Sequence, residues 1–227
     1  MGEITGSAPP ALRERLRHVY WVGGGSGAGK SVIARRLAAQ YGLRRYLTDD
    51  VMADHARRAT AADAPFLAEF AAMDMDDRWV NRSPETMLAT FHWFRGEGFG
   101  LIVEDLLSLP AHPPVLAEGF RLLPHLVAPL LTSPVQAVWL LPTPAYRRAA
   151  FASRGSLWKI AGKTSDRDRA LRNLLDRDRL FTDRLRAETS RLGLPAIEVD
   201  GTASEADLAE RVATALGLPA RQAKAGE

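Results

Sequence analysis

The segment at residues 24–31 reads GGSGAGKS and matches the pattern G-x-x-x-x-G-K-[ST] at every fixed position. Residues 18–22 before it have the apolar character of a short buried strand, and residues 32–41 after it carry apolar side chains at helical spacing. A strand, a glycine-rich loop and a helix in this order form the setting in which the pattern binds phosphate. The sequence therefore predicts a loop that holds the phosphates of a nucleoside triphosphate.

The positions of this loop each have a chemical reason. Glycines let backbone N–H groups curl closely around an anion, and the N-terminus of the following helix adds the positive end of its dipole. Lys30 supplies a mobile positive charge for the β- and γ-phosphates, and the Ser31 hydroxyl is expected to bind Mg²⁺. The predicted nucleotide-binding residues are Gly24, Gly25, Ser26, Gly27, Ala28, Gly29, Lys30 and Ser31.

Length and composition favour a single domain. The chain has 227 residues, of which 46% are hydrophobic, enough for one α/β core with an insertion or lid. It has no cysteine, which excludes disulfides and thiolate metal sites, and no apolar run that approaches the length of a membrane span. A net charge of only +3, with acidic residues interspersed among the basic ones, argues against nucleic acid as a partner. We expect a cytoplasmic protein, monomeric or homodimeric, with no membrane partner.

Five apolar segments that read as strands alternate with helical segments, and they lie at 18–22, 43–48, 114–118, 135–141 and 196–200. This alternation predicts the α/β class, with a five-stranded parallel sheet and helices on both faces. The domain is expected to span residues 18–217, between a flexible segment at 1–17 and a flexible tail at 218–227. Two segments are additional to the strands and helices of a minimal parallel sheet: a helical insertion at about 54–109 and a charged segment at about 154–191. Because ligands bind beyond the carboxyl ends of parallel strands, both are candidate substrate and lid elements.

Asp49 and Asp50 follow the second predicted strand, next to where the phosphate loop presents the γ-phosphate. A carboxylate there orients a hydroxyl nucleophile and accepts its proton. We assign this catalytic role to Asp49, at the tip of the strand, and expect Asp50 to lie near the substrate. The competing interpretation is that one of the pair caps a helix that starts at Val51.

Glu118 ends the predicted strand at 114–118, which is where a carboxylate is placed to hold Mg²⁺, and Gly119 allows a sharp turn after it. Residues 101–105 are a rival, because they too are apolar residues followed by acids. Their continuation through Leu109 keeps helical spacing, so they predict an amphipathic helix instead. Glu118 and Ser31 are therefore the predicted metal ligands.

Two arginines of the charged segment, Arg154 and Arg167, are predicted to reach the transferring phosphoryl group from a lid. Residues 155–163 between them lack any acid and contain two glycines that could serve as hinges. The alternative is an exposed helix laced with i,i+4 ion pairs, which accounts for most of the charges in this segment. With Lys30 and Asp49, these two arginines complete the predicted catalytic set.

The polar and aromatic residues of the first insertion and of the turn after Glu118 form the predicted substrate pocket. Such a set is what a pocket for a small hydroxylated substrate needs. The alternative is that the tryptophans belong to the core and that the histidine is structural. The residues concerned are Asp77, Arg78, Trp79, His92, Trp93 and Arg121.

With these residues placed, the chain resembles the P-loop small-molecule kinases of the nucleotide-kinase-like group. Residues 48–50 are similar to the region of the catalytic aspartate in polynucleotide kinases and chloramphenicol phosphotransferase, and gluconate and shikimate kinases share the same plan. Residues 116–119 are similar to a stretch in kinases related to 2-phosphoglycerate kinase. The resemblance implies a parallel sheet in the order 2-3-1-4-5, ATP with Mg²⁺, and transfer of the γ-phosphoryl group to a hydroxyl.

Departures from the family pattern narrow the function. Ser26 stands where nucleoside monophosphate kinases usually carry proline, and the first insertion lacks their arginine pair for an acceptor phosphate. No N-K-x-D motif of G proteins is present. The sequence thus favours an ATP-dependent phosphotransferase acting on a hydroxyl of a small molecule such as a sugar, sugar acid, nucleoside or antibiotic. A regulatory or assembly ATPase with a protein partner, and a nucleic-acid end kinase, are the alternatives.

Overall fold

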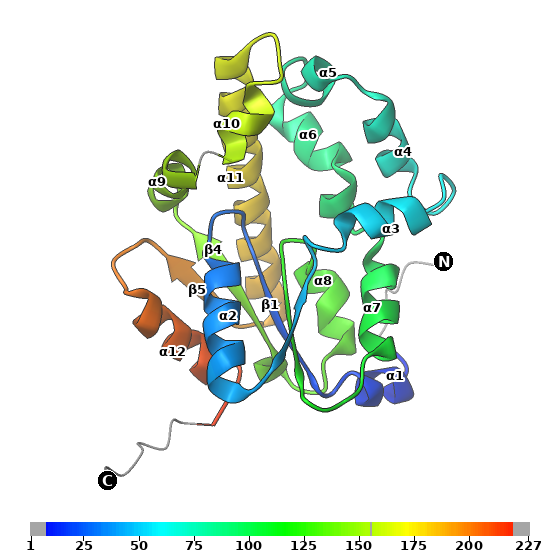
Figure 1. Cartoon of the computed structure of the whole chain (residues 1–227), viewed down its shortest axis with the longest axis vertical. Coiled ribbons are helices and arrows are strands. Elements are labelled where there is room, and N and C mark those ends of the chain that lie inside the picture. Colours follow the sequence, from blue (N-terminus) through cyan, green and yellow to red (C-terminus); the bar gives the residue numbers. More distant parts are fainter. Residues whose placement is uncertain (1–7, 155, 220–227) are drawn as a thin grey trace.

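A computed structural model describes residues 8–154 and 156–219. Its strands form one parallel sheet in the order β2-β3-β1-β4-β5, which confirms the predicted α/β class, sheet and strand order (Figure 1). The pairing register brings Glu118 of β3 beside Val22 of β1 and Leu47 of β2. The strands are β1 (Val19–Gly24), β2 (Arg44–Leu47), β3 (Val115–Glu118), β4 (Ala137–Pro142) and β5 (Ala196–Val199).

Helices cover both faces of the sheet, as the sequence predicts. One face is covered by α2 (Lys30–Tyr41) and α12 (Glu205–Ala215). The other face is covered by α7 (Phe99–Ser108), α8 (Pro124–Val127) and the lower part of α11 (Arg167–Leu192). Short 3₁₀ turns, η2 (Ala128–Leu130) and η3 (Pro134–Gln136), lead from α8 into β4.

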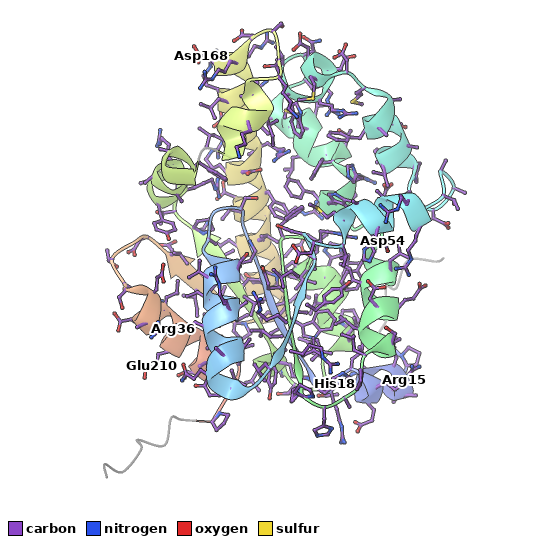
Figure 2. All side chains as sticks on the ribbon, viewed as in Figure 1. Arg15, His18, Arg36, Asp54, Asp168 and Glu210 are labelled. Atoms are coloured by element: carbon purple, nitrogen blue, oxygen red, sulfur yellow. The ribbon has the colours of Figure 1, made fainter. Side chains whose placement is uncertain are left out.

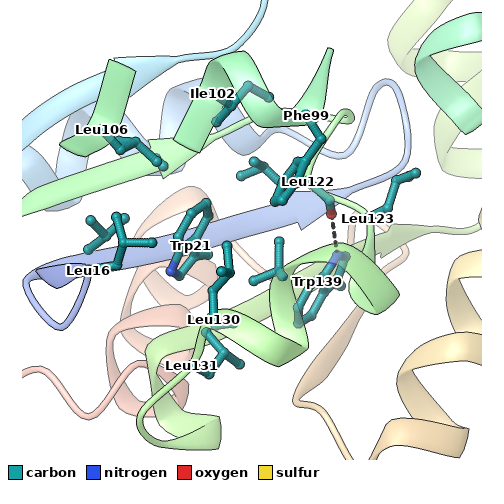
Figure 3. Packing of buried hydrophobic residues seen from close by; sticks show 14 of the residues in the cluster. Leu16, Trp21, Phe99, Ile102, Leu106, Leu122, Leu123, Leu130, Leu131 and Trp139 are labelled. Atoms are coloured by element: carbon teal, nitrogen blue, oxygen red, sulfur yellow. Dashed lines mark hydrogen bonds between the residues drawn. The ribbon is translucent and has the colours of Figure 1, made fainter. Parts of the chain in front are cut away.

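The alternation of side chains along the central strands explains this layering. Trp21 of β1 and Trp139 of β4 point into the core under α7, α8 and α11, while Val22 and Leu140 point to α2 and α12. The Trp139 indole also donates a hydrogen bond of 2.8 Å to the Leu122 carbonyl, so its one polar atom is satisfied inside the core (Figure 3). Both faces of the central strands are therefore apolar, as a doubly covered parallel sheet requires.

The first insertion forms a helical layer above the carboxyl edge of the sheet (Figure 1). Its apolar side chains pack against α9, α10 and the upper part of α11 through a cluster that includes Trp79, Met87, Phe151 and Leu174. The elements concerned are α3 (Met52–Arg58), α4 (Pro65–Ala72), α5 (Met75–Trp79), α6 (Pro84–Thr90), η1 (His92–Arg95), α9 (Pro144–Arg154) and α10 (Ser156–Ala161).

The segment predicted as a lid at 154–191 is largely a packed helix. From Arg167 onward it forms α11, 26 residues long, whose buried positions include Ala170, Leu174, Phe181 and Leu185. These positions share one helical face, which packs first on α5, α6 and α10 and then on α8 and β4. Most acids and bases of this helix lie on its solvent side, whereas Arg177 and Asp178 are buried and form an ion pair of 2.6 Å.

The flexible lead-in predicted at residues 1–17 is wrong for the part that the structure describes. Residues 10–15 form α1 (Pro10–Arg15), and Ala8 and Leu16 on either side are buried. Arg13 donates a 2.8 Å hydrogen bond to the Leu131 carbonyl, which fixes this helix to η2. The described part of the predicted tail also contains a buried residue, Leu218.

Charged side chains labelled in Figure 2, such as Arg15, Arg36 and Glu210, lie on the outer surface of the helices. Among the described residues, every helix is too short or too polar to cross a bilayer.

The fourth strand begins at Ala137, two residues later than predicted, because residues 134–136 form a 3₁₀ turn closed by the Gln136 side chain.

The contact between Phe181 of α11 and Phe94 of η1 predicts that packing of the insertion on α11 contributes to the stability of the fold. The two rings stack at 3.7 Å with an interplanar angle of 6°, and both are buried. Phe181→Ala should lower the free energy of unfolding by about 3–5 kcal/mol, the usual cost of a large cavity. Urea denaturation followed by circular dichroism measures this loss.

Val135→Ala is the matched control, since Val135 is 48% exposed and its truncation should change stability by less than about 0.5 kcal/mol. Equal losses in the two variants would contradict the stacking as a major contact.

Candidate functional site

A cavity of about 180 Å³ lies at the carboxyl edge of β1, β2 and β3. The strand register explains its composition, because the segments that follow Val22, Leu47 and Glu118 all leave the sheet at the same edge. The cavity therefore joins the glycine-rich loop with residues from two other turns. Its lining consists of Ser26, Gly27, Ala28, Gly29, Lys30, Ser31, Asp49, Glu118 and Phe120.

The glycine-rich loop has the backbone shape of an anion cradle. Gly27 and Gly29 both have φ of 80°, a left-handed conformation that side-chain-bearing residues rarely adopt. Gly29 is also the N-cap of α2 and offers no side chain to the N–H groups of the first turn. These N–H groups and the helix dipole thus face the cavity, which fits a phosphate group.

Gly25 is needed for a different reason. A Cβ atom there would lie 2.6 Å from the Thr182 hydroxyl of α11 and 3.0 Å from Pro142 at the end of β4. The loop is therefore supported from behind by α11 and β4.

Lys30, Ser31 and Glu118 meet at the floor of the cavity. The Lys30 ammonium donates a 2.8 Å hydrogen bond to the Gly25 carbonyl, which keeps the charge against the loop. Burial raises the pKa of the Glu118 carboxyl, while the Lys30 charge and a hydrogen bond from the Ser31 hydroxyl act in the opposite direction. The two predicted metal ligands, Ser31 and Glu118, are thus in direct contact.

Asp49 and Asp50 differ in position. Asp49 reaches solvent at the cavity mouth, yet the surrounding protein partly desolvates its carboxyl and raises the pKa, against the lowering effect of Lys30 and Arg121. Asp50 is exposed and does not line the cavity. Neither aspartate caps a helix with its side chain, because α3 begins at Met52 with Val51 as its N-cap and no side-chain cap bond. The capping interpretation is therefore wrong.

The charges of the cavity fit a polyphosphate that carries a divalent cation. The lining offers one ammonium, on Lys30, and two carboxylates, on Asp49 and Glu118. A bare polyphosphate would be repelled by the carboxylates, whereas Mg²⁺ takes one or two protein oxygens and completes its shell with phosphate and water. Within the described ranges no cluster of three or more His, Asp or Glu side chains could hold a metal alone.

The structure does not bring Arg167, one of the two predicted lid arginines, to the loop. Arg167 starts α11, and Thr182, the α11 residue beside Gly25, follows fifteen residues later, about 22 Å along the helix axis. Asp168, next to Arg167, marks the end of α11 farthest from the sheet in Figure 2. The side chain of Arg154 and residue Gly155 lie outside the described part of the chain.

Arg147 is an arginine beside the glycine-rich loop that was not predicted from the sequence. It lies in the first turn of α9, is 2% exposed, and its Cγ is 3.7 Å from the Cβ position of Gly27. Its guanidinium donates a hydrogen bond to the Thr182 hydroxyl. The signal that could have found it is its position directly after the end of the fourth strand, at the same edge as the glycine-rich loop.

The six predicted substrate residues do not line this cavity. Trp79, His92 and Trp93 are buried among aromatic rings, and burial lowers the pKa of His92 to about 4, with the charges of Arg121 and Arg78 acting in the same direction. Arg78 donates to the Phe70 carbonyl at 3.0 Å.

The other two predicted substrate residues, Asp77 and Arg121, also lie outside the lining of this cavity. Asp77 is exposed and accepts a hydrogen bond from Asn81. Arg121 is buried and hydrogen-bonds to Thr48, next to Asp49. The core interpretation therefore describes the tryptophans and the histidine better than the pocket interpretation.

Comparisons with known proteins assign no family to the chain. No family model and no curated protein matches the chain. A crystal structure of an uncharacterized protein from Eubacterium ventriosum ATCC 27560 is similar, with a TM-score of 0.46 and 13% sequence identity, over 88% of this chain and 97% of that chain.

The charge coupling in the cavity leads to a prediction on titration. Lys30→Met removes a positive charge that favours the ionised forms of Asp49 and Glu118, so the pKa of both carboxyls should rise. Carboxyl-carbon NMR during a pH titration measures both values. Arg36→Met is the matched control, since it removes the same charge from the exposed side of the same helix, and an equal effect there would contradict local coupling.

Proposed function

We propose that the protein is an ATP-dependent phosphotransferase that moves the γ-phosphoryl group to a hydroxyl of a small molecule. The observation that carries the proposal is the single cavity in which the glycine-rich loop, Lys30, Asp49 and Glu118 meet. An anion cradle, a cation for the γ-phosphate and two carboxylates are the parts that phosphoryl transfer to a hydroxyl requires.

Each residue has a role in this proposal. The loop N–H groups and Lys30 bind the phosphates and offset negative charge on the transferring group. Ser31 and Glu118 would hold Mg²⁺, which supplies charge neutralisation across the phosphates when bound. Asp49, at the mouth of the cavity, orients the acceptor hydroxyl and accepts its proton as the oxygen bonds to phosphorus and ADP leaves.

A second cavity, of about 150 Å³, is suited to the nucleobase. It lies between Tyr146 and the turn at Asp200 and Gly201, after the last strand. Tyr146 directly precedes Arg147, which packs beside Gly27, and both cavities lie at the carboxyl edge of the sheet. The cavity at the loop alone is too small for a whole nucleotide, and an aromatic ring with a nearby carboxylate can stack on and hydrogen-bond to a base.

Screening ATP consumption against sugars, sugar acids, nucleosides and aminoglycoside or phenicol antibiotics tests the proposal and identifies the acceptor. Phosphorylated product with one acceptor class supports it. Steady ATP turnover without any acceptor, stimulated by a protein, would favour the regulatory ATPase instead.

Mg-ATP should stabilise the protein, because a ligand bound only by the folded state adds about 2.7 kcal/mol at a hundredfold excess over Kd. Thermal denaturation with and without millimolar Mg-ATP measures this gain. Lys30→Ala should fold normally, lose most of the stabilisation and show no measurable transfer. An unchanged melting temperature of the wild-type protein in Mg-ATP would count against nucleotide binding.

Asp49→Asn should retain Mg-ATP binding and lose kcat by roughly 10²- to 10⁴-fold, the usual range for removal of a general base. Asp50→Asn is the matched comparison, since it removes the same charge one residue later, outside the cavity lining. It should affect KM for the acceptor more than kcat. The reverse order of effects would assign the base to Asp50.

A further inference from the structure

Arg121 is a buried cation that joins three segments around the Asp49 turn. It follows β3 by three residues, is 2% exposed, and its guanidinium lies 4.0 Å above the Trp93 ring. It donates to the Thr48 carbonyl at 3.4 Å and to the Gly98 carbonyl at 3.3 Å. Thr48 precedes Asp49, so the backbone of the proposed base is tied directly to this arginine.

His55 fixes the third side of Arg121 and has a defined tautomer. The Arg121 Nη2 atom lies 3.0 Å from Nδ1 of His55, and a guanidinium only donates, so Nδ1 accepts. The proton of the neutral ring is therefore on Nε2, which donates to the Asp105 carboxylate at 2.8 Å. The His55 side chain is completely buried, and Asp105 also accepts from Tyr46 and Arg58. The chain of contacts thus runs from the Asp49 turn to the protein surface.

This arrangement is costly as a structural device alone. The direct hydrogen-bond partners of Arg121 are two carbonyls and a neutral imidazole, with no carboxylate, and its Nε has no partner within the described residues. Burial lowers the pKa of Arg121 to about 10, while Tyr46, Asp49 and Asp105 act in the opposite direction. A buried cation without a paired carboxylate usually destabilises a fold, so its retention calls for a use of the charge.

We propose that Arg121 is a positioning residue for Asp49, which holds the turn at Thr48 against Trp93 and places a fixed positive charge beside the carboxylate. The kinetic part of this inference rests on the proposed phosphoryl transfer, whereas the electrostatic part does not. The charged groups that face Asp49 are Lys30 from α2, Asp50 from its own turn, and Glu118 and Arg121 from β3 and the segment after it. Arg121 is bonded to the turn itself, through the Thr48 carbonyl.

Three variants separate charge from geometry. Arg121→Met removes both, and Arg121→Lys keeps the charge but cannot span Thr48, Gly98 and His55 together. Arg58→Met removes the outer contacts to Asp54, Glu104 and Asp105 and leaves the hydrogen bonds of Arg121 in place. Carboxyl-carbon NMR titration of Asp49 in nucleotide-free protein, and the pH profile of kcat/KM, are the readouts. Thermal denaturation reports folding.

Arg121→Met should raise the titration midpoint of Asp49, because a cation that favours the carboxylate is lost, and shift the acidic limb of kcat/KM to higher pH. Arg121→Lys should leave the midpoint near that of the wild type and lower kcat by up to about 100-fold, through misplacement of the turn. Arg58→Met should change neither readout.

A folded Arg121→Met protein with an unchanged Asp49 midpoint overturns the inference, as does wild-type kcat in Arg121→Lys. If Arg121→Met does not fold, His55→Phe replaces it, since it removes the acceptor that orients Arg121 but keeps an aromatic ring, and it should also raise the midpoint. Absence of any phosphoryl transfer, together with a shifted midpoint, would overturn the proposed function while the electrostatic role of Arg121 stands.

Discussion

The parallel pairing of β3 with both β1 and β2 is the constraint on which the site depends. Glu118 lies beside Val22 on one side and Leu47 on the other, so β2 and β3 end together and β1 ends two residues beyond them. The segments that follow these three strands surround one cavity. A shift of one residue in β3 would turn Glu118 to the opposite face of the sheet and away from Ser31. The apolar packing on both faces, with Trp21 on one and Val22 on the other, fixes this register.

The charged side chains at this edge of the sheet influence one another's ionisation. Lys30 favours the ionised forms of both Asp49 and Glu118, although burial opposes them. Arg121 also favours the ionised form of Asp49, and its own hydrogen bonds go to neutral groups. The ionisation of the Asp49 carboxyl therefore depends on the positions of both cations.

The sequence was sufficient for the sheet, its strand order and the loop, because these follow from short local patterns and from the resemblance to P-loop kinases. Ser31, Asp49 and Glu118 line one cavity for a related reason, since Glu118 ends β3 and the other two lie in the segments that follow β1 and β2. Contacts between distant segments could not be predicted in this way. The pair of His55 with Asp105 depends on how α3 packs against α7, and no spacing in the sequence encodes it. For Arg147, the place after the fourth strand indicates the right edge of the sheet, but the contact with Gly27 depends on how α9 packs.

The lid shows why charge alone was a poor guide. Residues 167–191 are rich in arginine and aspartate, yet one apolar face makes them a packed helix that connects both halves of the site. Thr182 supports the loop, and one turn or more earlier the Arg177 guanidinium lies 5.0 to 5.3 Å from the rings of Trp79, Phe91 and Phe94.

Asn173 extends the same connection, since its amide donates to the carbonyls of Trp79, Val80 and Arg82 in the insertion. The distance between the insertion and the loop is therefore set by a continuous helix and not by flexible segments on either side. In the proposed reaction, an acceptor bound between the insertion and the loop would meet elements whose spacing is already fixed. The shape and polarity of these elements, more than closure of a long lid, would then select the acceptor.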